Sequence, residues 1–559
     1  MFLKTFFLFI ILFIYRSFFI LNKTLSSGDW PYLYLENIKE FSFFPHLRFF
    51  WIDPYYQITS KVLVEYLGLN WNIAEKILWF WPFIIISFFS SFYLVKKVIP
   101  NLKLWVLAPF IFLTNTYALM IVGGGQMGVA IAYSLAPLVL GMFIKHIDNL
   151  VLSSQNIKYQ ISNIKHFLVT GLVLALQMMF DPRITYITFI PIFLYFIFTF
   201  VFTDNKRKVI LNSLILIVPL LFSVILNSFW IVSLLRYGLP PQDIAKMSAL
   251  GFKFLSFADL SHTISMLHPN WPENIFGKVY FMKSEFVLLP VVAYSSLLFL
   301  RNKTLKNANQ NAEKRRILFF ALLGLVGTFL AKGSNPPFAF INEFFFSHFL
   351  GMSMFRDPTK FYLLIVLSYS ILIPFSLEKI SQVLVENRKF KIANFYFKFK
   401  IYYVLLLFTV YYLLFLIRPG MMGELGGTFK ARDVPKEYIQ LKDFLIKQNS
   451  PFKTLWFPER QRFGFRSTSH PAISSSDFFE SSQGKDLLKE FENVDVREKL
   501  RKESVKYIIV PFDSEKEIFL EDRKYSEKKH TLTIKKLKSL SWLNEIASFN
   551  RVKVFEIIN

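Results

Sequence analysis

Residues 355–377 read FRDPTKFYLLIVLSYSILIPFSL. The charged residues of this stretch, Arg356, Asp357 and Lys360, precede an uncharged apolar run over residues 361–377. An α-helix rises about 1.5 Å per residue, so about 20 mostly apolar residues cross a bilayer. The stretch therefore predicts a membrane-spanning helix that the chain enters through a charged loop.

Comparable apolar stretches recur through the first three quarters of the chain, and we count about eleven in all. They cover residues 2–21, 77–95, 104–122, 128–144, 167–180, 184–203, 209–235, 286–300, 317–331, 361–377 and 401–417. The first stretch contains Arg16 and lacks a small-residue cleavage site, so we predict an anchor rather than a cleaved signal peptide. The sequence therefore predicts a polytopic α-helical membrane protein with about eleven transmembrane helices.

The composition excludes several other classes of protein. Of 559 residues, 64 are Lys or Arg and 39 are Asp or Glu, which gives a formal net charge of +25. In a soluble protein this excess would favour nucleic acid, but 53% of the residues are hydrophobic and the mean hydropathy is +0.40. We therefore predict membrane lipids and no nucleic acid as partners. The sequence has no cysteine, which excludes disulfides, thiolate metal sites and cysteine nucleophiles.

The distribution of Lys and Arg predicts the topology. A cytoplasmic N-terminus makes one set of loops internal, and their Lys and Arg density is about three times that of the opposite loops. The internal loops are then residues 96–103, 145–166, 204–208, 301–316 and 379–400. The long outer loops are residues 22–76, 236–285 and 332–360. We predict a multi-pass protein of the cytoplasmic membrane whose C-terminal part is extracytoplasmic.

The composition changes to mixed charge beyond residue 417, and no later segment could span a bilayer. We therefore divide the chain into a transmembrane domain, residues 1–417, and a soluble domain, residues 418–559. The soluble part has strand patterns and stretches of helical composition, which predict a small α/β domain. The strand patterns cover residues 453–458, 505–511 and 552–557, the last as an edge or closing strand, and the helical stretches cover residues 438–447 and 482–501.

Two acids of the first outer loop are candidate catalytic residues. Asp29 lies beside Gly28, which allows an unusual turn, and beside Trp30, which could stack on a sugar ring. A carboxylate here could deprotonate an acceptor hydroxyl; the alternative is an ordinary Asx turn or helix cap. Asp53 is a second candidate, with a turn or an interfacial aromatic belt as its alternative. His46 lies between these acids and could assist them, bind metal or contact the sugar, although a lone His is more often structural.

Three cations are candidate phosphate ligands. Arg356 and Lys360 belong to the charged loop quoted above, and Arg183 follows Phe180-Asp181-Pro182 at the end of a predicted span. A guanidinium offers a bidentate fork to phosphate, and Lys adds a point charge. The alternative is local pairing of Arg183 with Asp181 and of Arg356 with Asp357, while Lys360 snorkels.

A third outer segment, Leu267-His268-Pro269-Asn270-Trp271-Pro272, offers candidate sugar contacts at His268 and Trp271. Interfacial anchoring is the alternative for both residues. No stretch has a recognised metal-ligand spacing. The sequence therefore identifies no definite cofactor, and it is compatible with a divalent cation.

The arrangement resembles the GT-C superfamily of polytopic membrane glycosyltransferases. It is similar to the membrane portion of bacterial α-arabinofuranosyltransferases and to the related lipoteichoic-acid glycosylation membrane proteins. The resemblance rests on three short motifs and on the outer C-terminal domain. The motifs are Gly28-Asp29 after the first span, Phe180-Asp181-Pro182-Arg183, and Phe355-Arg356-Asp357-Pro358-Thr359-Lys360-Phe361.

The resemblance implies a hexosyl- or pentosyltransferase. It would move a sugar from a polyprenyl-phosphate donor to a cell-envelope glycan or glycolipid at the outer face of the membrane. Asp29 would match the family's first-loop base, and Arg356 with Lys360 would hold the donor phosphate. Two alternatives stay open: a transporter or flippase for lipid-linked glycans, and a non-catalytic envelope scaffold or sensor.

Overall fold

A computed structural model describes most of the chain and divides it into two compact units. The described residues are 2–30, 35–42, 50–152, 164–203, 206–238, 249–269, 282–300, 308–386, 395–422, 429–479, 487–493, 495–512 and 526–558. The first unit comprises Met1–Arg16, Phe44–Pro54 and Trp79–Gly427. The second unit comprises Ser17–Phe43, Tyr55–Leu78 and Thr428–Asn559, so it contains segments of the predicted first outer loop as well as the C-terminal part.

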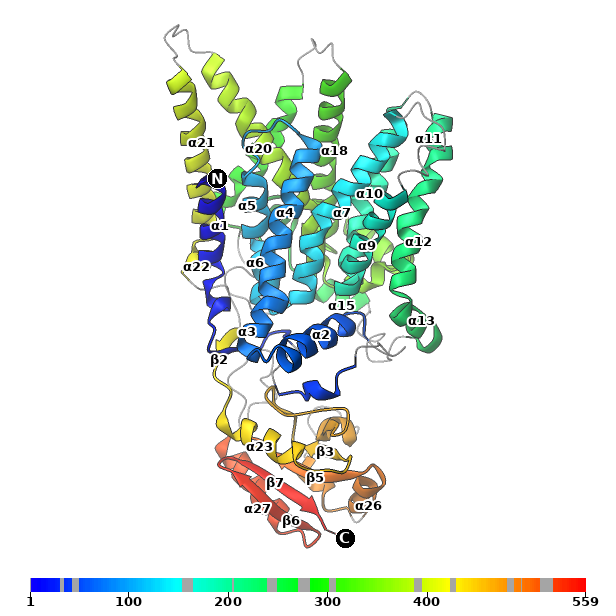
Figure 1. Ribbon diagram of the computed structural model, residues 1–559, viewed down its shortest axis with the longest axis vertical. Coiled ribbons are helices and arrows are strands. Elements are labelled where there is room, and N and C mark those ends of the chain that lie inside the picture. Colours follow the sequence, from blue (N-terminus) through cyan, green and yellow to red (C-terminus); the bar gives the residue numbers. More distant parts are fainter. Residues whose placement is uncertain are drawn as a thin grey trace. The chain divides into compact units, whose positions relative to one another are not determined.

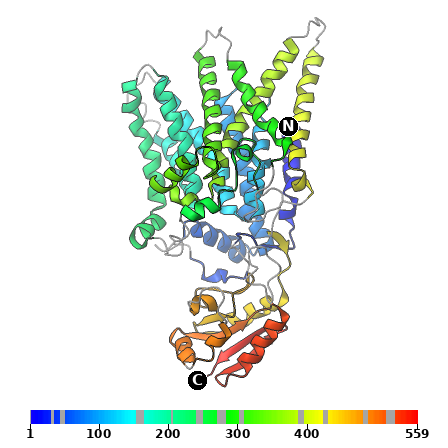
Figure 2. The ribbon, with the colours of Figure 1, turned by 180° about the vertical axis from the view of Figure 1, so that it is seen from behind.

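The first unit is a helical bundle (Figures 1 and 2). Its principal helices within the described residues are α1 (Phe2–Ile14), α4 (Trp81–Val98), α5 (Leu107–Thr114), α6 (Thr116–Gly123), α7 (Met127–Leu152), α9 (Ile164–Phe180), α10 (Pro182–Val201), α11 (Lys206–Ser213), α12 (Ile217–Leu226), α13 (Ser228–Tyr237), α15 (Ala249–Phe254), α16 (Leu260–Ile264), α17 (Leu288–Tyr294), α18 (Ala308–Ala331), α19 (Ala339–His348), α20 (Tyr362–Glu386), α21 (Phe395–Leu416) and α22 (Arg418–Met421).

Four helices within the described ranges are long and apolar enough to cross a membrane, or up to five if a bent pair counts as one span. The four are Trp71–Val98, Met127–Leu150, Pro182–Val201 and Pro358–Leu384. Shorter apolar helices lie at Thr5–Ile14, Ile164–Phe180, Ser284–Leu300 and Tyr402–Leu416. The chain is a multi-pass membrane protein, but these helices do not reproduce the predicted count of about eleven spans.

One predicted span, residues 104–122, is broken at Asn115 into α5 and α6. The Asn115 side chain donates to the carbonyl of Phe112 at 2.8 Å and accepts the N–H of Ala118 at 2.9 Å. Because these bonds satisfy backbone groups that the break leaves without helical partners, the interruption is tolerated in an apolar environment.

A second predicted span, residues 209–235, is bent by 73° between Leu214–Leu226 and Ser228–Tyr237. Asn227 lies at the bend, and its amide donates to the carbonyls of Ser223 and Ala175 at 3.0 and 3.1 Å. A polar side chain inside an apolar run thus marks the break, as at Asn115, and explains why one predicted span becomes two shorter helices.

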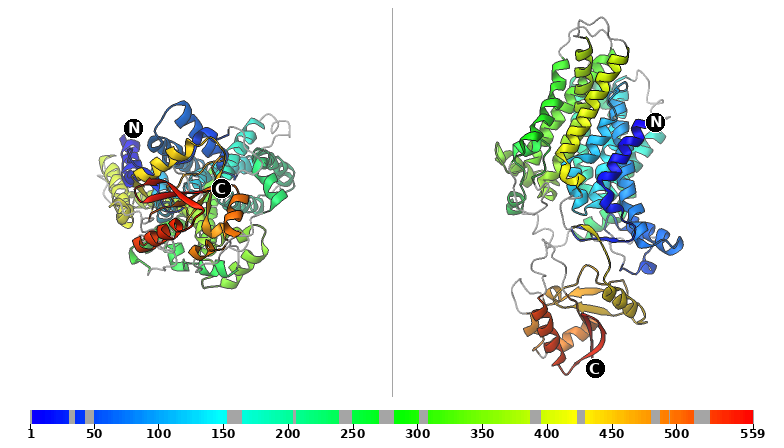
Figure 3. Two further views of the ribbon diagram at one scale, coloured as in Figure 1. Left: turned by 90° about the horizontal axis from the view of Figure 1, so that it is seen from below. Right: turned by 90° about the vertical axis from the view of Figure 1, so that its left-hand side faces the viewer.

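Small residues allow the long helices to approach closely. A Cβ atom on Gly327 of α18 would lie 2.7 Å from the Cβ of Leu364 in α20. A Cβ on Gly171 of α9 would lie 2.9 Å from the carbonyl oxygen of Pro219 in α12. Glycine therefore permits contacts that a larger residue would block, as is common between membrane helices. Figure 3 shows α20 and α21 packed side by side.

The second unit contains a five-stranded sheet of order β4-β3-β5-β7-β6. Strands β4 and β5 run parallel to β3, whereas β7 is antiparallel to both β5 and β6. The predicted strands appear as β3, β5 and β7, but β7 is internal, so the expectation of an edge strand was wrong. The strands are β3 (Lys453–Trp456), β4 (Ala472–Ser474), β5 (Val505–Val510), β6 (Leu543–Phe549) and β7 (Val552–Ile557), and the helices include α3 (Trp71–Glu75), α23 (Lys436–Ile446), α24 (Ser475–Phe478), α25 (Leu487–Glu490), α26 (Asp495–Lys502) and α27 (Glu527–Lys538).

Both faces of this sheet are covered. Leu500 of α26 and Leu537 of α27 pack on one face together with Ile508, and all three are buried. Tyr438 and Leu441 of α23 pack on the other face. Side chains of β5 alternate between these two apolar clusters, which is the pattern of a strand buried on both sides. The C-terminal part of the chain is thus the small α/β structure that its composition predicts.

A separate two-stranded sheet joins distant parts of the sequence within the second unit. Strand β1 (Thr24–Ser26) pairs antiparallel with β2 (Lys430–Arg432), and Leu25 lies opposite Ala431. The strand that leads to Asp29 is therefore hydrogen-bonded to the segment that leads into the α/β structure.

Candidate functional site

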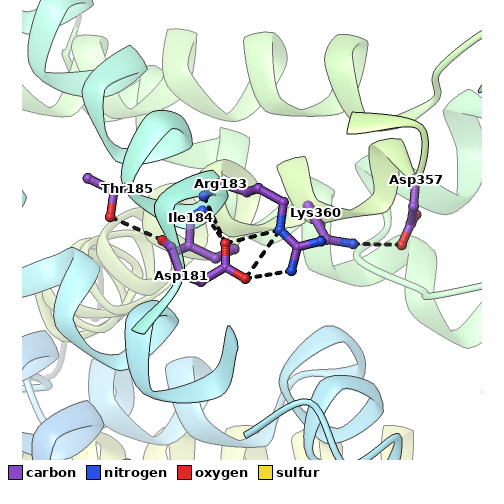
Figure 4. Close-up of polar contacts among 6 residues, drawn as sticks. All are labelled: Asp181, Arg183, Ile184, Thr185, Asp357 and Lys360. Carbon is purple, nitrogen blue, oxygen red and sulfur yellow. Dashed lines mark hydrogen bonds and ion pairs between the residues drawn. The ribbon is translucent and has the colours of Figure 1, made fainter. Parts of the chain in front are cut away.

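The turn between α9 and α10 carries an ion pair between a buried carboxylate and a half-buried guanidinium. Asp181 caps α10: its Oδ1 accepts the N–H groups of Arg183 and Ile184 at 2.8 and 3.2 Å. The Arg183 guanidinium folds back and donates from Nε to Oδ1 at 3.1 Å and from Nη2 to Oδ2 at 2.6 Å (Figure 4). The local pairing considered from the sequence is thus present, and the carboxylate fixes the direction of the guanidinium.

The charged loop before α20 carries a second pair. Asp357 caps the turn Pro358–Phe361, and its Oδ1 accepts the N–H and the hydroxyl of Thr359 at 3.1 and 2.6 Å. Its Oδ2 accepts Nζ of Lys360 at 3.1 Å. Asp357 therefore pairs with Lys360, where the sequence had indicated Arg356, because the tight turn returns the side chain at position i+3 to the capping residue.

The two pairs lie next to each other, and Figure 4 shows the Arg183 and Lys360 side chains between the two carboxylates. Burial raises the pKa of Asp181, but Arg183 and Lys360 outweigh it and lower that pKa below its usual value. Burial likewise raises the pKa of Asp357, and Lys360 with the Thr359 hydrogen bond lowers it overall. Both acids are therefore ionised at neutral pH, and the four groups have a formal charge of zero.

Aromatic rings pack beside this cluster, which we call the four-charge cluster (Asp181, Arg183, Asp357 and Lys360). The ring of Tyr117 stacks on Tyr362 at 5.9 Å and on His268 at 6.4 Å between centroids. Among the described residues the hydroxyl of Tyr117, a side chain with 1% exposure, has no hydrogen-bond partner. It lies within electrostatic range of the cluster, and its hydrogen-bonding capacity is unused within the described residues.

The segment that contains His268 is tied to the helices. The hydroxyl of Thr116 donates to the carbonyl of Met266 at 2.7 Å and accepts the N–H of His268 at 2.9 Å. Tyr362 donates to the carbonyl of Leu267 at 2.9 Å. Burial lowers the pKa of His268 to about 4, so its imidazole is neutral at physiological pH.

We expect Asp181→Ala to destabilise the protein by about 3 kcal/mol, because it removes the partner of Arg183 and the helix cap together. This loss of stability is at the low end of the range for breaking a buried ion pair, because the Arg183 side chain is 34% exposed. Equilibrium unfolding in mixed micelles measures the change. Asp181→Asn keeps an acceptor for the cap and should lose less; equal stability of Asp181→Ala and the wild type would contradict the role of this pair.

The other predicted cations and acids do not belong to the four-charge cluster. Arg356 follows the turn Met352–Phe355, and its side chain is exposed. Asp53 begins α2 (Asp53–Ser60), where its carboxylate accepts the N–H of Phe50 at 3.1 Å. This contact is the local turn considered from the sequence. His46 and Trp271 lie outside the described residues.

Asp29 belongs to the second unit and follows a tight turn. Its side chain is exposed, whereas Trp30 is 1% exposed and packs against Phe429 at 5.4 Å between ring centroids. Trp30 is therefore part of an apolar core, and the predicted stacking on a sugar ring would need an open ring face that Trp30 lacks in this structure.

The structure thus brings together Arg183, Lys360 and His268 from the predicted set, and adds Tyr117, which the sequence analysis did not single out. Its signal was the polar stretch Asn115-Thr116-Tyr117 inside an apolar run. Within the described ranges, no group of three or more His, Asp or Glu side chains could hold a metal ion.

Comparison with known proteins identifies the fold of the chain that carries this site. No protein-family model matches the sequence, and no curated protein matches it either. Among solved structures, the arabinofuranosyltransferase AftD from Mycobacteria matches with a TM-score of 0.54 and 13% identity over 98% of this chain. The chain has the GT-C fold.

The archaeal oligosaccharyltransferase AglB from Archaeoglobus fulgidus, in complex with an inhibitory peptide and a dolichol-phosphate, shares this fold. It matches with a TM-score of 0.50 and 12% identity, over 91% of this chain and 69% of AglB. This chain spans 37% of the length of AftD. The GT-C resemblance indicated by the sequence is confirmed at the level of the fold, which by itself does not specify the reaction.

Proposed function

We propose that this GT-C chain is a membrane glycosyltransferase. It moves a hexosyl or pentosyl group from a polyprenyl-phosphate donor to a cell-envelope glycan or glycolipid, at the outer face of the cytoplasmic membrane. The N-terminus is cytoplasmic in this proposal, and the C-terminal domain is extracytoplasmic. The observation that carries it is the four-charge cluster beside the unpartnered hydroxyl of Tyr117, within a GT-C fold.

Arg183, Lys360 and Arg356 take the donor phosphate in this proposal. The paired acids hold Arg183 and Lys360 in fixed directions, so little ordering is left when an anion arrives. The cluster itself is neutral, so the exposed Arg356 supplies the excess positive charge that an incoming phosphate requires. The hydroxyl of Tyr117 adds a neutral donor.

Asp29 acts as the general base. It removes the proton of the acceptor hydroxyl as the acceptor oxygen bonds to the anomeric carbon of the donor sugar. The bond between that carbon and the phosphate oxygen breaks, and the polyprenyl phosphate leaves with both bonding electrons. Asp53 is the second candidate acid, and His46, His268 and Trp271 are the candidates for sugar or acceptor contact.

The test is transfer by the purified protein in lipid nanodiscs, supplied with polyprenyl-phosphate sugars and envelope glycolipid acceptors. We expect a glycosylated acceptor and free polyprenyl phosphate in equal amounts. Adding EDTA and then a divalent cation in the same assay decides metal dependence. Movement of the lipid-linked sugar across a proteoliposome membrane without transfer would instead support a flippase. The absence of both transfer and movement would support a scaffold.

A further inference from the structure

The backbone before Asp29 adopts a costly conformation. Ser27 and Gly28 both lie in the left-handed region, with φ of +79° and +58°. A residue other than glycine rarely adopts this conformation, and it persists only where surrounding contacts enforce it. The N–H of Trp30 donates to the carbonyl of Ser27 at 3.3 Å and closes the turn.

The side chain of Arg462, which lies far along the sequence, donates hydrogen bonds to this turn. Its Nη2 donates to the carbonyl of Gly28 at 2.7 Å, and its Nη1 donates to the carbonyl of Trp30 at 3.4 Å. These two carbonyls belong to the residues on either side of Asp29. A guanidinium is planar and presents its N–H groups in a fixed fork, so one side chain fixes both neighbours of the exposed acid at once.

The segment that presents Arg462 is itself anchored. It lies between β3 and β4, where Phe465 is buried and Nη2 of Arg466 pairs with the carboxylate of Glu36 at 2.7 Å. The hydroxyl of Tyr56 donates to the same carboxylate at 2.9 Å. Arg462 therefore extends from a braced segment of the second unit.

Two further contacts hold the residues that flank Asp29. Trp30 packs on Phe429, which in turn stacks on Phe18 at 5.5 Å between centroids. Strand β1, which ends at Ser26, is hydrogen-bonded to β2. The backbone is thus fixed before and after Asp29, while the carboxylate itself remains exposed.

We propose that Arg462 is a positioning residue for Asp29: its guanidinium fixes the strained turn so that the carboxylate has one direction. The C-terminal α/β structure thereby contributes to proton removal without touching the substrate. This inference rests on the proposed function, in which Asp29 is the base.

The test compares Arg462→Met with Arg501→Met in the nanodisc assay. A misplacement of about 1 Å can cost about 10²-fold in rate, so we expect Arg462→Met to lower kcat about 10²-fold with an unchanged KM for the donor. Arg501→Met removes an equal charge from an exposed position of α26 in the same unit, and should keep the wild-type kcat. Arg462→Lys, which keeps the charge but lacks the planar fork, should fall between the two.

A double mutant separates positioning from general stability. If Arg462 acts through Asp29, Arg462→Met should cause no further loss in an Asp29→Asn background. Hydrogen exchange provides a readout without activity: the Trp30 amide should exchange faster in Arg462→Met and at the wild-type rate in Arg501→Met. Asp29-dependent transfer with an undiminished kcat in Arg462→Met would overturn this inference alone, whereas absence of transfer by the wild type would overturn the proposed function.

Discussion

Asp29→Asn is expected to lower kcat for glycosyl transfer by about 10²- to 10⁴-fold, the usual contribution of a general base. Asparagine keeps the size of the side chain and the ability to accept hydrogen bonds in the turn, but it does not take up a proton at neutral pH. Because Asp29 is exposed, the protein should fold and insert normally. Initial rates at saturating donor and acceptor, together with unfolding curves, measure both effects.

Asp53→Asn is the matched control. Asp53 accepts the N–H of Phe50, and an asparagine at the start of α2 can replace that acceptor. A large loss in Asp53→Asn with full activity in Asp29→Asn would transfer the role of the base to Asp53. Full activity in both variants would remove these acids from the mechanism.

Lys360→Gln is expected to lower kcat/KM by about 10²- to 10³-fold, the range for removing one fixed donor at a site of developing charge. Its Nζ is held by Asp357, and the residue is 8% exposed, so the cation faces a partly desolvated environment in which its charge has a large effect. Dependence of the rate on the concentration of a polyprenyl-phosphate sugar gives kcat and KM separately.

Asp357→Asn distinguishes a phosphate ligand from a structural ion pair. If Lys360 serves only to neutralise Asp357, removing either charge should impair the protein in the same direction. If Lys360 holds an anionic donor, Asp357→Asn removes a competing carboxylate while keeping an acceptor for Thr359, and the KM for the donor should fall. Loss of activity in Asp357→Asn equal to that in Lys360→Gln would argue against phosphate binding.

Local sequence patterns predicted those parts of the fold that depend on neighbours in the chain. The uncharged run over residues 361–377 forms a buried helix, and the mostly apolar residues 505–510 form a strand covered on both faces. The Asp181–Arg183 pair could also be predicted from the sequence, because a separation of two residues brings the two charges together at the start of a helix.

Contacts between residues far apart in the chain left no local sequence pattern from which they could be predicted. The pairing of β1 with β2 and the stacking of Tyr117 on Tyr362 depend on residues hundreds of positions apart. The breaks at Asn115 and Asn227 were hidden because hydropathy averages a single polar residue into its apolar surroundings. Arg462 belongs to none of the sequence motifs, because its carbonyl partners lie 432 and 434 positions away.

The β1–β2 pairing has a consequence for biosynthesis. Arg462 and Gly28 are separated by 434 positions, and β2 likewise follows β1 only after the whole helical bundle has been synthesised. At about 5–20 residues per second, translation of that interval takes on the order of 20–90 s. During this time β1 lacks β2, and the rings of Phe18 and Trp30 lack Phe429, so a nascent chain that stalls before residue 429 would present these surfaces to folding factors and proteases.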